Sequence, residues 1–150
     1  MNTEKKLRCV VSGSFAKFKP EIDRAIDQLT DLGVMVLAPD KGWLYKPPTR
    51  LYFPEDKQFR PLPSEVGMSV RQIEDSFLLA LSRSDFVYVV NPGGHVGETV
   101  SMEMGFALAL GIPVYLQEPV DLSLDLDPVW QETMKSLEVI PIEKLVGEVN

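Results

Sequence analysis

Short apolar runs and longer segments with helical spacing alternate along this chain. Five of the runs are bounded by turn residues and are typical of strands buried on both faces. They span residues 7–12, 34–38, 86–90, 114–116 and 139–140. Four segments between or after them repeat apolar residues every three or four positions, which predicts helices over residues 20–32, 68–84, 98–110 and 128–137. The pattern therefore predicts strands and helices that follow one another in turn.

Proline and glycine mark the ends of these predicted helices. Pro20 fits the first helical position and is followed by acids that favour a helix amino end, and Gly33 suits the end of the same helix. Gly111, with Pro113 just beyond it, suits the end of the helix over 98–110. Asp127 precedes Pro128 and suits a cap for the last predicted helix.

A parallel sheet with helices on both faces is the fold that this alternation predicts. We expect an α/β, flavodoxin-like (Rossmann-like), doubly wound sheet of five strands in the order 2-1-3-4-5, forming one domain over residues 1–150. In that order a ligand binds at the carboxyl ends of the first and third strands. The turns that follow these two strands hold the predicted ligand contacts: Ser12, Gly13, Ser14, Asn91, Gly93 and Gly94.

Glu103 is the main candidate for chemistry. From Val100 to Leu110, all residues except Ser101 and Glu103 are apolar, glycine or alanine. A helix that is apolar on all sides is normally buried. A carboxylate there needs specific partners, and the nearby helix amino end favours its ionised form. Such a carboxylate suits a nucleophile at a sugar carbon. The alternative is a structural glutamate held by backbone amides or by an arginine.

The other polar candidates are weaker. Asp40 follows the second strand at the correct edge of the sheet, but acids in such turns are common. Asp85 precedes the third strand and belongs at the opposite edge, and Glu98 stands about 140° around its helix from Glu103. His95, the single histidine, lies in the glycine-rich turn, where we expect it to face solvent or, alternatively, to contact the ligand.

Residues 41–67 fit no regular period. The segment is rich in proline, and its aromatic residues alternate with charges. A compact domain seldom carries so long an irregular segment without a role. It is expected to be a lid over the ligand, or alternatively an ordered flap that covers a sheet edge or an oligomer interface.

Composition narrows the class of partner. The net charge of -7 disfavours a nucleic-acid polymer or an anionic membrane surface, whereas a small anionic ligand can still bind backbone amides at a turn. No apolar run is long enough to span a bilayer, and the amino terminus lacks the apolar core of a signal peptide, so a cytoplasmic location is expected. The one cysteine, Cys9, lies in a predicted strand and is expected to be buried. No metal site and no cofactor are predicted.

Two stretches resemble the nucleoside 2-deoxyribosyltransferase superfamily, which includes the 2'-deoxynucleoside 5'-phosphate N-hydrolases. They are Glu103-Met104-Gly105-Phe106-Ala107 followed by Leu110-Gly111-Ile112-Pro113-Val114, and the early Val11-Ser12-Gly13-Ser14-Phe15. The resemblance implies a flavodoxin-like fold, frequent dimers or larger homo-oligomers, and cleavage of the N-glycosidic bond of a nucleoside or nucleotide. It also implies that Glu103 attacks the anomeric carbon, that a second base or water resolves the intermediate, and that Ser12, Gly13 and Ser14 line the sugar or phosphate pocket.

The chain departs from that family at two places. Gly97 stands where the transferases usually carry an aspartate for the sugar 5'-hydroxyl, and Asp75 is out of spacing for the base-recognising aspartate. The stretch from Pro92 to Glu103 is also similar to the turn of the lysine-decarboxylase-like phosphoribohydrolases, which cleave nucleoside 5'-monophosphates. A third hypothesis is a non-catalytic nucleotide-binding module, in which Glu103 would point into packing.

Overall fold

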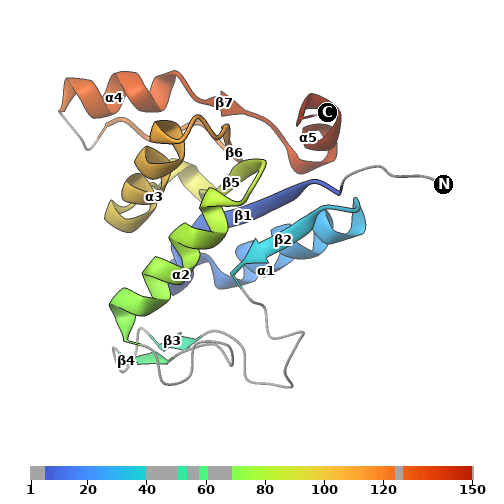
Figure 1. Cartoon of the computed structure of the whole chain (residues 1–150). Coiled ribbons are helices and arrows are strands. Elements are labelled where there is room, and N and C mark those ends of the chain that lie inside the picture. Colours follow the sequence, from blue (N-terminus) through green and yellow to red (C-terminus); the bar gives the residue numbers. More distant parts are fainter. Residues whose placement is uncertain (1–5, 40–50, 54–57, 61–68, 124–126, 150) are drawn as a thin grey trace.

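The computed structural model describes residues 6–39, 51–53, 58–60, 69–123 and 127–149 (Figure 1). Its main sheet has five strands in the order β2-β1-β5-β6-β7, and each neighbouring pair is parallel. The strands are β1 (Arg8–Gly13), β2 (Met35–Ala38), β5 (Phe86–Val90), β6 (Val114–Leu116) and β7 (Glu138–Val139). Numbered within this sheet alone, the order is 2-1-3-4-5, so the predicted α/β doubly wound fold is confirmed.

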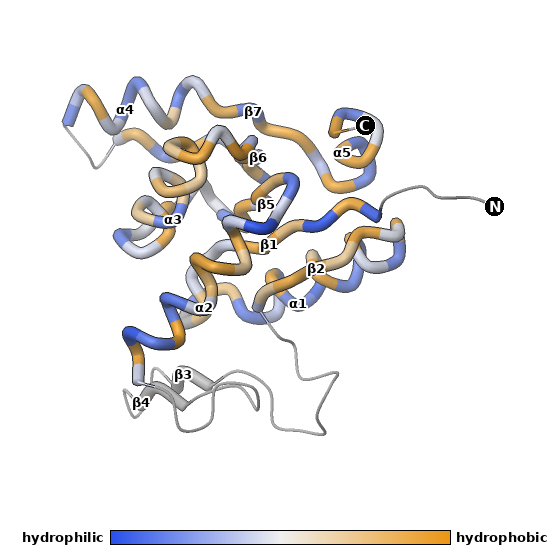
Figure 2. The backbone as a smooth tube through the Cα atoms, in the orientation of Figure 1, coloured by the Kyte–Doolittle hydropathy of each residue, from blue (hydrophilic) through white to orange (hydrophobic). Residues whose placement is uncertain are grey.

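Two helical layers cover the two faces of the sheet. Helices α1 (Phe15–Asp31) and α5 (Ile142–Val149) pack with Cys9, Val11 and Tyr88 in one buried cluster. Helices α2 (Val70–Ser82), α3 (Glu98–Ala109) and α4 (Pro128–Lys135) pack with Val10 and Val87 in the other. Neighbouring strand residues belong to different clusters because successive side chains point to opposite faces. The central strands are mainly hydrophobic for this reason, and β5 and β6 are largely orange in Figure 2.

Helix α1 begins earlier than the sequence predicts. It starts at Phe15, and Pro20 lies inside it rather than at its first position. The backbone at Phe18 is not helical (φ -127°, ψ 29°), so the helix is kinked two residues before the proline. Because this kink already interrupts the helical hydrogen bonds, Pro20 is tolerated as it would be in a first helical turn.

Helix α2 starts with a capping box. Ser69 Oγ accepts a hydrogen bond from the Gln72 amide at 3.1 Å, and the Ser69 amide donates to Gln72 Oε1 at 2.9 Å. Apolar residues at helical spacing in this segment are expected to be buried, but Val70, in the first turn of α2, is 66% exposed. Leu81, near the other end of the helix, is fully buried as expected.

The prediction that α3 is buried on all sides is wrong in this chain. Val100, Glu103, Met104 and Ala107 are buried against the sheet, whereas Met102 is 52% exposed. Hydropathy along a helix does not determine how many of its sides contact other elements, and one side of α3 is exposed to solvent.

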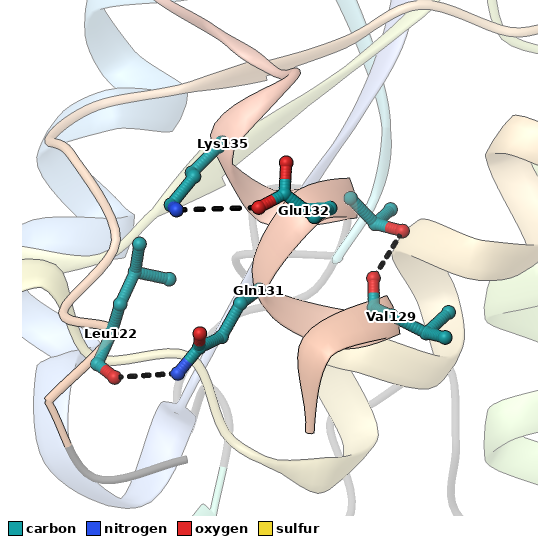
Figure 3. Close-up of polar contacts among 6 residues, drawn as sticks. Leu122, Val129, Gln131, Glu132 and Lys135 are labelled. Carbon is teal, nitrogen blue, oxygen red and sulfur yellow. Dashed lines mark hydrogen bonds and ion pairs between the residues drawn. The ribbon is translucent and has the colours of Figure 1, made fainter. Parts of the chain in front are cut away.

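Helix α4 is fixed to the rest of its layer by polar contacts (Figure 3). Asp127 Oδ1 accepts a hydrogen bond from the Val129 amide at 2.9 Å, which confirms the predicted cap. Gln131 Nε2 donates to the Leu122 carbonyl at 3.2 Å, as Figure 3 shows. Trp130 Nε1 donates to Ser101 Oγ of α3 at 3.2 Å. These bonds hold α4 beside α3.

Most of the segment 41–67 lies outside the described residues. Its described parts are the strands β3 (Leu51–Phe53) and β4 (Gln58–Arg60), which pair antiparallel in a separate two-stranded sheet. The lid function therefore stays a prediction. Among the described residues, no helix is both long and apolar enough to cross a membrane.

Candidate functional site

The carboxyl ends of β1 and β5 lie side by side, as the strand order requires. Gly13 pairs with Val90 at the last position of both strands. A Cβ atom on Gly13 would lie 2.9 Å from the Val90 carbonyl oxygen and 3.0 Å from Cδ1 of Ile22, so this position needs glycine for close packing. The turn after β1 and the turn after β5 therefore meet at the same edge of the sheet.

Ser12 and Glu103 form the polar contact at this edge. Ser12 Oγ donates a hydrogen bond to Glu103 Oε1 at 2.6 Å, across a sequence separation of 91 residues. Strand alternation places Ser12 on the same face as Val10, the face on which α3 packs. Glu103 stands in the second turn of α3 and points inward, which brings its carboxylate to the serine hydroxyl.

This pair is buried. Ser12 is 1% exposed and Glu103 is 5% exposed, and Val100, Met104 and Ala107 of α3 pack in the apolar cluster beside them. A buried carboxylate is stable only where hydrogen bonds replace its hydration. A bond of 2.6 Å from a hydroxyl has the length expected for a donor that meets an ionised carboxylate. The arrangement fixes the carboxylate in one orientation.

Asn91 follows β5 and joins it to the segment after β6. Its Nδ2 atom donates to the Glu118 carbonyl at 2.8 Å, and its Oδ1 atom accepts from the Glu118 amide at 3.0 Å. The side chain is fully buried, so its amide serves as a backbone substitute between two strand ends. Direct ligand contact by Asn91 stays a prediction.

The glycine turn at Pro92–Gly94 is a single 3-10 turn held against residues 118–121. Gly94 has φ +83°, and a Cβ atom there would lie 2.6 Å from the Pro119 carbonyl oxygen. The Gly93 amide donates to Glu118 Oε2 at 3.1 Å. A carboxylate of the chain itself therefore occupies the amide that an anionic ligand could otherwise use at this turn.

The ring of His95, in the segment after β5, contacts the ring of Phe18 in α1. The two ring centroids are 5.9 Å apart with an interplanar angle of 63°, an edge-to-face geometry. The kink of α1 at Phe18 accompanies this contact, which joins the β1–α1 segment to the β5–α3 segment. His95 is partly buried, so it does not simply face solvent. Sequence reasoning missed Phe18, since nothing local distinguishes this aromatic residue from a core residue.

The remaining candidates separate by position. Asp85 Oδ2 accepts a hydrogen bond from the Arg8 amide at 2.8 Å, at the amino edge of the sheet, as its place before the third predicted strand suggests. Glu98 is exposed in the first turn of α3, away from the buried carboxylate of Glu103. Ser14 is the N-cap residue of α1 and makes no side-chain cap hydrogen bond. Asp40 lies outside the described residues.

The described part of the chain contains no cluster of side chains that could bind a metal ion. No group of three or more histidine, cysteine, aspartate or glutamate side chains lies there in a position to hold a metal ion. The polar groups that do converge, a hydroxyl and a carboxylate, are suited to acyl or glycosyl chemistry by a nucleophile.

Comparison with known proteins supports the fold and leaves the activity open. No protein-family model matches this chain, and no curated protein matches it. The chain is similar to a solved structure, the crystal structure of a conserved protein from Enterococcus faecalis V583, with a TM-score of 0.58 and 16% sequence identity. The match covers 97% of this chain and 98% of that one, so the same fold extends over both.

Proposed function

We propose that this protein binds a nucleoside or nucleotide at the carboxyl edge of β1 and β5 and cleaves its N-glycosidic bond, with Glu103 as the nucleophile. The observation that supports this most is the hydrogen bond of 2.6 Å between Ser12 Oγ and Glu103 Oε1 at that edge. Doubly wound sheets bind ligands where neighbouring strands send their connections to opposite faces. β1 and β5 do so, since α1 and α3 lie on opposite faces.

The proposed reaction has two displacements. A carboxylate oxygen of Glu103 forms a bond to the anomeric carbon while the carbon–nitrogen bond breaks, and the base leaves with the bonding electrons and gains a proton. Water or a second base then attacks the same carbon and releases the carboxylate. Ser12 acts as a positioning residue in this scheme, because its hydroxyl favours the ionised, oriented form of Glu103.

The other candidates take supporting roles in this proposal. Ser14, whose side chain makes no cap hydrogen bond, is the candidate for contact with a sugar hydroxyl or phosphate, whereas Glu118 already occupies the Gly93 amide. The Phe18–His95 ring pair lies between the two connecting segments and suits contact with a planar base.

A non-catalytic nucleotide-binding module is the second candidate. The observation that favours it is the low exposure of Glu103, 5%, since a nucleophile must reach its substrate. Phosphoribohydrolase activity on a nucleoside 5'-monophosphate is the alternative enzyme reaction. It also breaks an N-glycosidic bond and differs from deoxyribosyl transfer only in its substrate.

A chromatographic assay for free base tests the proposal. We expect base release, or base exchange when a second base is added, from one of the deoxynucleosides, ribonucleosides or their 5'-monophosphates. The preferred substrate distinguishes deoxyribosyl transfer from phosphoribohydrolase activity. Thermal stabilisation by one of these ligands without any base release would instead support the binding module.

The variant Glu103→Gln tests the nucleophile. The amide has nearly the shape of the carboxylate and can still accept a hydrogen bond from Ser12, so fold and ligand affinity should persist while turnover falls by at least about a thousandfold. Glu98→Gln, on the same helix but exposed, is the matched control and should keep wild-type rates. A Glu103→Gln protein with an unchanged rate would show that another group attacks.

A further inference from the structure

The segment after β6 is fixed against the glycine turn by contacts that do not use the Glu118 side chain. The buried Asn91 side chain bonds both backbone groups of Glu118, at 2.8 Å and 3.0 Å. Three residues further on, the Asp121 amide donates to the Gly94 carbonyl at 2.8 Å. The backbone of Glu118 therefore stays beside the turn whatever its carboxylate does.

The Glu118 carboxylate is bound to one of the two glycine amides of this turn. The Gly94 amide donates to the Asn91 carbonyl at 2.8 Å and so closes the turn. The Gly93 amide instead donates to Glu118 Oε2 at 3.1 Å. Gly93 is exposed, and a Cβ atom there would meet no atom of the described residues within 4 Å, so a molecule from solvent can approach this position. The chain's own carboxylate thus takes the amide that an incoming anion would use.

Charge along the connections after β5 and β6 also opposes an anion. Residues 91–98 and 117–123 contain three acids and no lysine or arginine. The acids are Glu98, Glu118 and Asp121. A phosphate monoester carries a charge of about -1.5 to -2 at pH 7, and proteins bind it with open backbone amides and with cations. These two connections supply neither at the Gly93 amide.

We propose that Glu118 determines which substrate the site accepts, because it excludes a 5'-phosphate and favours the nucleoside without one. This inference rests on the proposed cleavage of an N-glycosidic bond. The two oxygens of a carboxylate can accept several hydrogen bonds, so Glu118 can bind the Gly93 amide and a sugar hydroxyl at once. A phosphate dianion has no proton to donate, and the carboxylate repels it. Glu118 is a specificity-determining residue in this scheme and takes no part in bond cleavage.

The selectivity is the kcat/KM for a nucleoside divided by the kcat/KM for its 5'-monophosphate, measured by base release with the base that is released fastest. We expect the wild type to favour the nucleoside and Glu118→Gln to lower this ratio by at least about tenfold. Glutamine keeps an oxygen for the Gly93 amide, and Asn91 still binds the backbone of residue 118, so the turn should stay in place. The ratio cancels any general loss of active protein.

Asp121→Asn is the matched control. It removes one negative charge from the same segment, but Asp121 Oδ1 accepts hydrogen bonds from the Ser123 amide at 2.9 Å and the Ser123 hydroxyl at 2.6 Å rather than from the turn. At an ionic strength of about 0.15 M, exposed charges more than about 8 Å apart are largely screened. The selectivity of Asp121→Asn should therefore stay within about twofold of that of the wild type.

A wild type that prefers the 5'-monophosphate overturns this inference. A ratio that Glu118→Gln leaves unchanged, or that Asp121→Asn lowers equally, overturns it as well, while base release still supports the proposed function. If no substrate releases its base, the proposed function fails instead, and selectivity is measured as thermal stabilisation by the same nucleoside and 5'-monophosphate. Glu118→Gln should then gain stabilisation by the 5'-monophosphate relative to the nucleoside, and Asp121→Asn should not. Equal responses of the three proteins, or no response to either ligand, overturn the inference.

Discussion

At the scale of single residues, one hydrogen bond determines how the candidate site is understood. Ser12 was expected to line a ligand pocket, but the structure gives its hydroxyl a partner inside the protein, Oε1 of Glu103. The serine thus explains how a carboxylate is tolerated at 5% exposure on an otherwise apolar inner face. It also explains why the residue at this position must be small and carry a hydrogen-bond donor, because α3 packs directly against this face of β1.

Removing this hydroxyl should weaken both stability and activity. Ser12→Ala removes one hydroxyl donor from a buried carboxylate, which destabilises the fold by about 1.5–3 kcal/mol. Loss of the hydroxyl also removes a contact that orients the Glu103 carboxylate, so the base release proposed above should slow. Ser12→Thr keeps the hydroxyl and should restore most of both properties. A Ser12→Ala protein that unfolds at the same urea concentration as the wild type would show that this hydrogen bond does not stabilise the fold.

The site could be predicted only in part from the sequence, and the reason is sequence distance. Glu103 was recognised because a carboxylate in an apolar helix is conspicuous, and the strand order placed its helix at the correct edge. Its partner is 91 residues away, and no local pattern connects the two. The Phe18–His95 contact depends in the same way on a kink that tertiary packing sets.

At the scale of elements, strand positions were predictable and helix faces were not. The strands are buried on both faces, so their apolar runs leave little choice of boundary, and each predicted run overlaps the observed strand. For a helix, the side that packs against the sheet must be predicted as well as the boundaries. Hydropathy identifies the buried side of α1, because its apolar residues at helical spacing, Ile22, Ala25, Ile26 and Leu29, are all buried. It cannot identify that side for α3, which is apolar on every side.

The glycine turn between β5 and α3 offers a test of how this connection is held. Gly93→Ala introduces a side chain at φ +69° where no other atom lies within 4 Å, so it should destabilise the protein by about 1–2 kcal/mol through backbone strain alone. Gly94→Ala adds steric overlap, since its Cβ would lie 2.6 Å from the Pro119 oxygen and 2.7 Å from the Asp121 nitrogen. Urea unfolding should therefore show a clearly larger loss for Gly94→Ala than for Gly93→Ala. Equal losses would mean that the segment 118–121 moves aside without resistance.

At the scale of the whole molecule, the two faces of the sheet differ in the polar groups that they bury. The face under α1 and α5 is closed by apolar contacts and by the Tyr88 hydroxyl, which donates to the Ile140 carbonyl at 3.0 Å. The face under α2, α3 and α4 carries the Ser12–Glu103 pair, and the exposed Met102 and Leu110 lie on the solvent side of its helix α3. Helix α3 therefore carries the buried carboxylate of Glu103 on its inner side and exposed apolar residues, among them Met102, on its solvent side.

Cys9 gives a probe of the stability of the whole fold. It lies in β1 with no exposed surface, and burial, together with the nearby negative charge of Asp85, raises its pKa from 9.0 to about 12. The folded state therefore keeps the thiol proton to higher pH than the unfolded state does. For a group of this kind, stability is fully present below the unfolded pKa and is lost as pH rises from about 9 towards about 12.

We expect the unfolding free energy of the wild type to fall relative to that of Cys9→Ala over this alkaline range, by at most about 1.4 kcal/mol for each pH unit. Tyr88, whose pKa is also raised by burial, titrates in both proteins and so cancels from the comparison. Urea unfolding of both proteins from pH 8 to pH 11 measures the difference. At neutral pH the thiol should react with a disulfide reagent only as fast as the fold opens, and added urea should accelerate it. A free energy difference that is constant with pH, or fast labelling of the folded protein, would mean that β1 opens locally without unfolding the sheet.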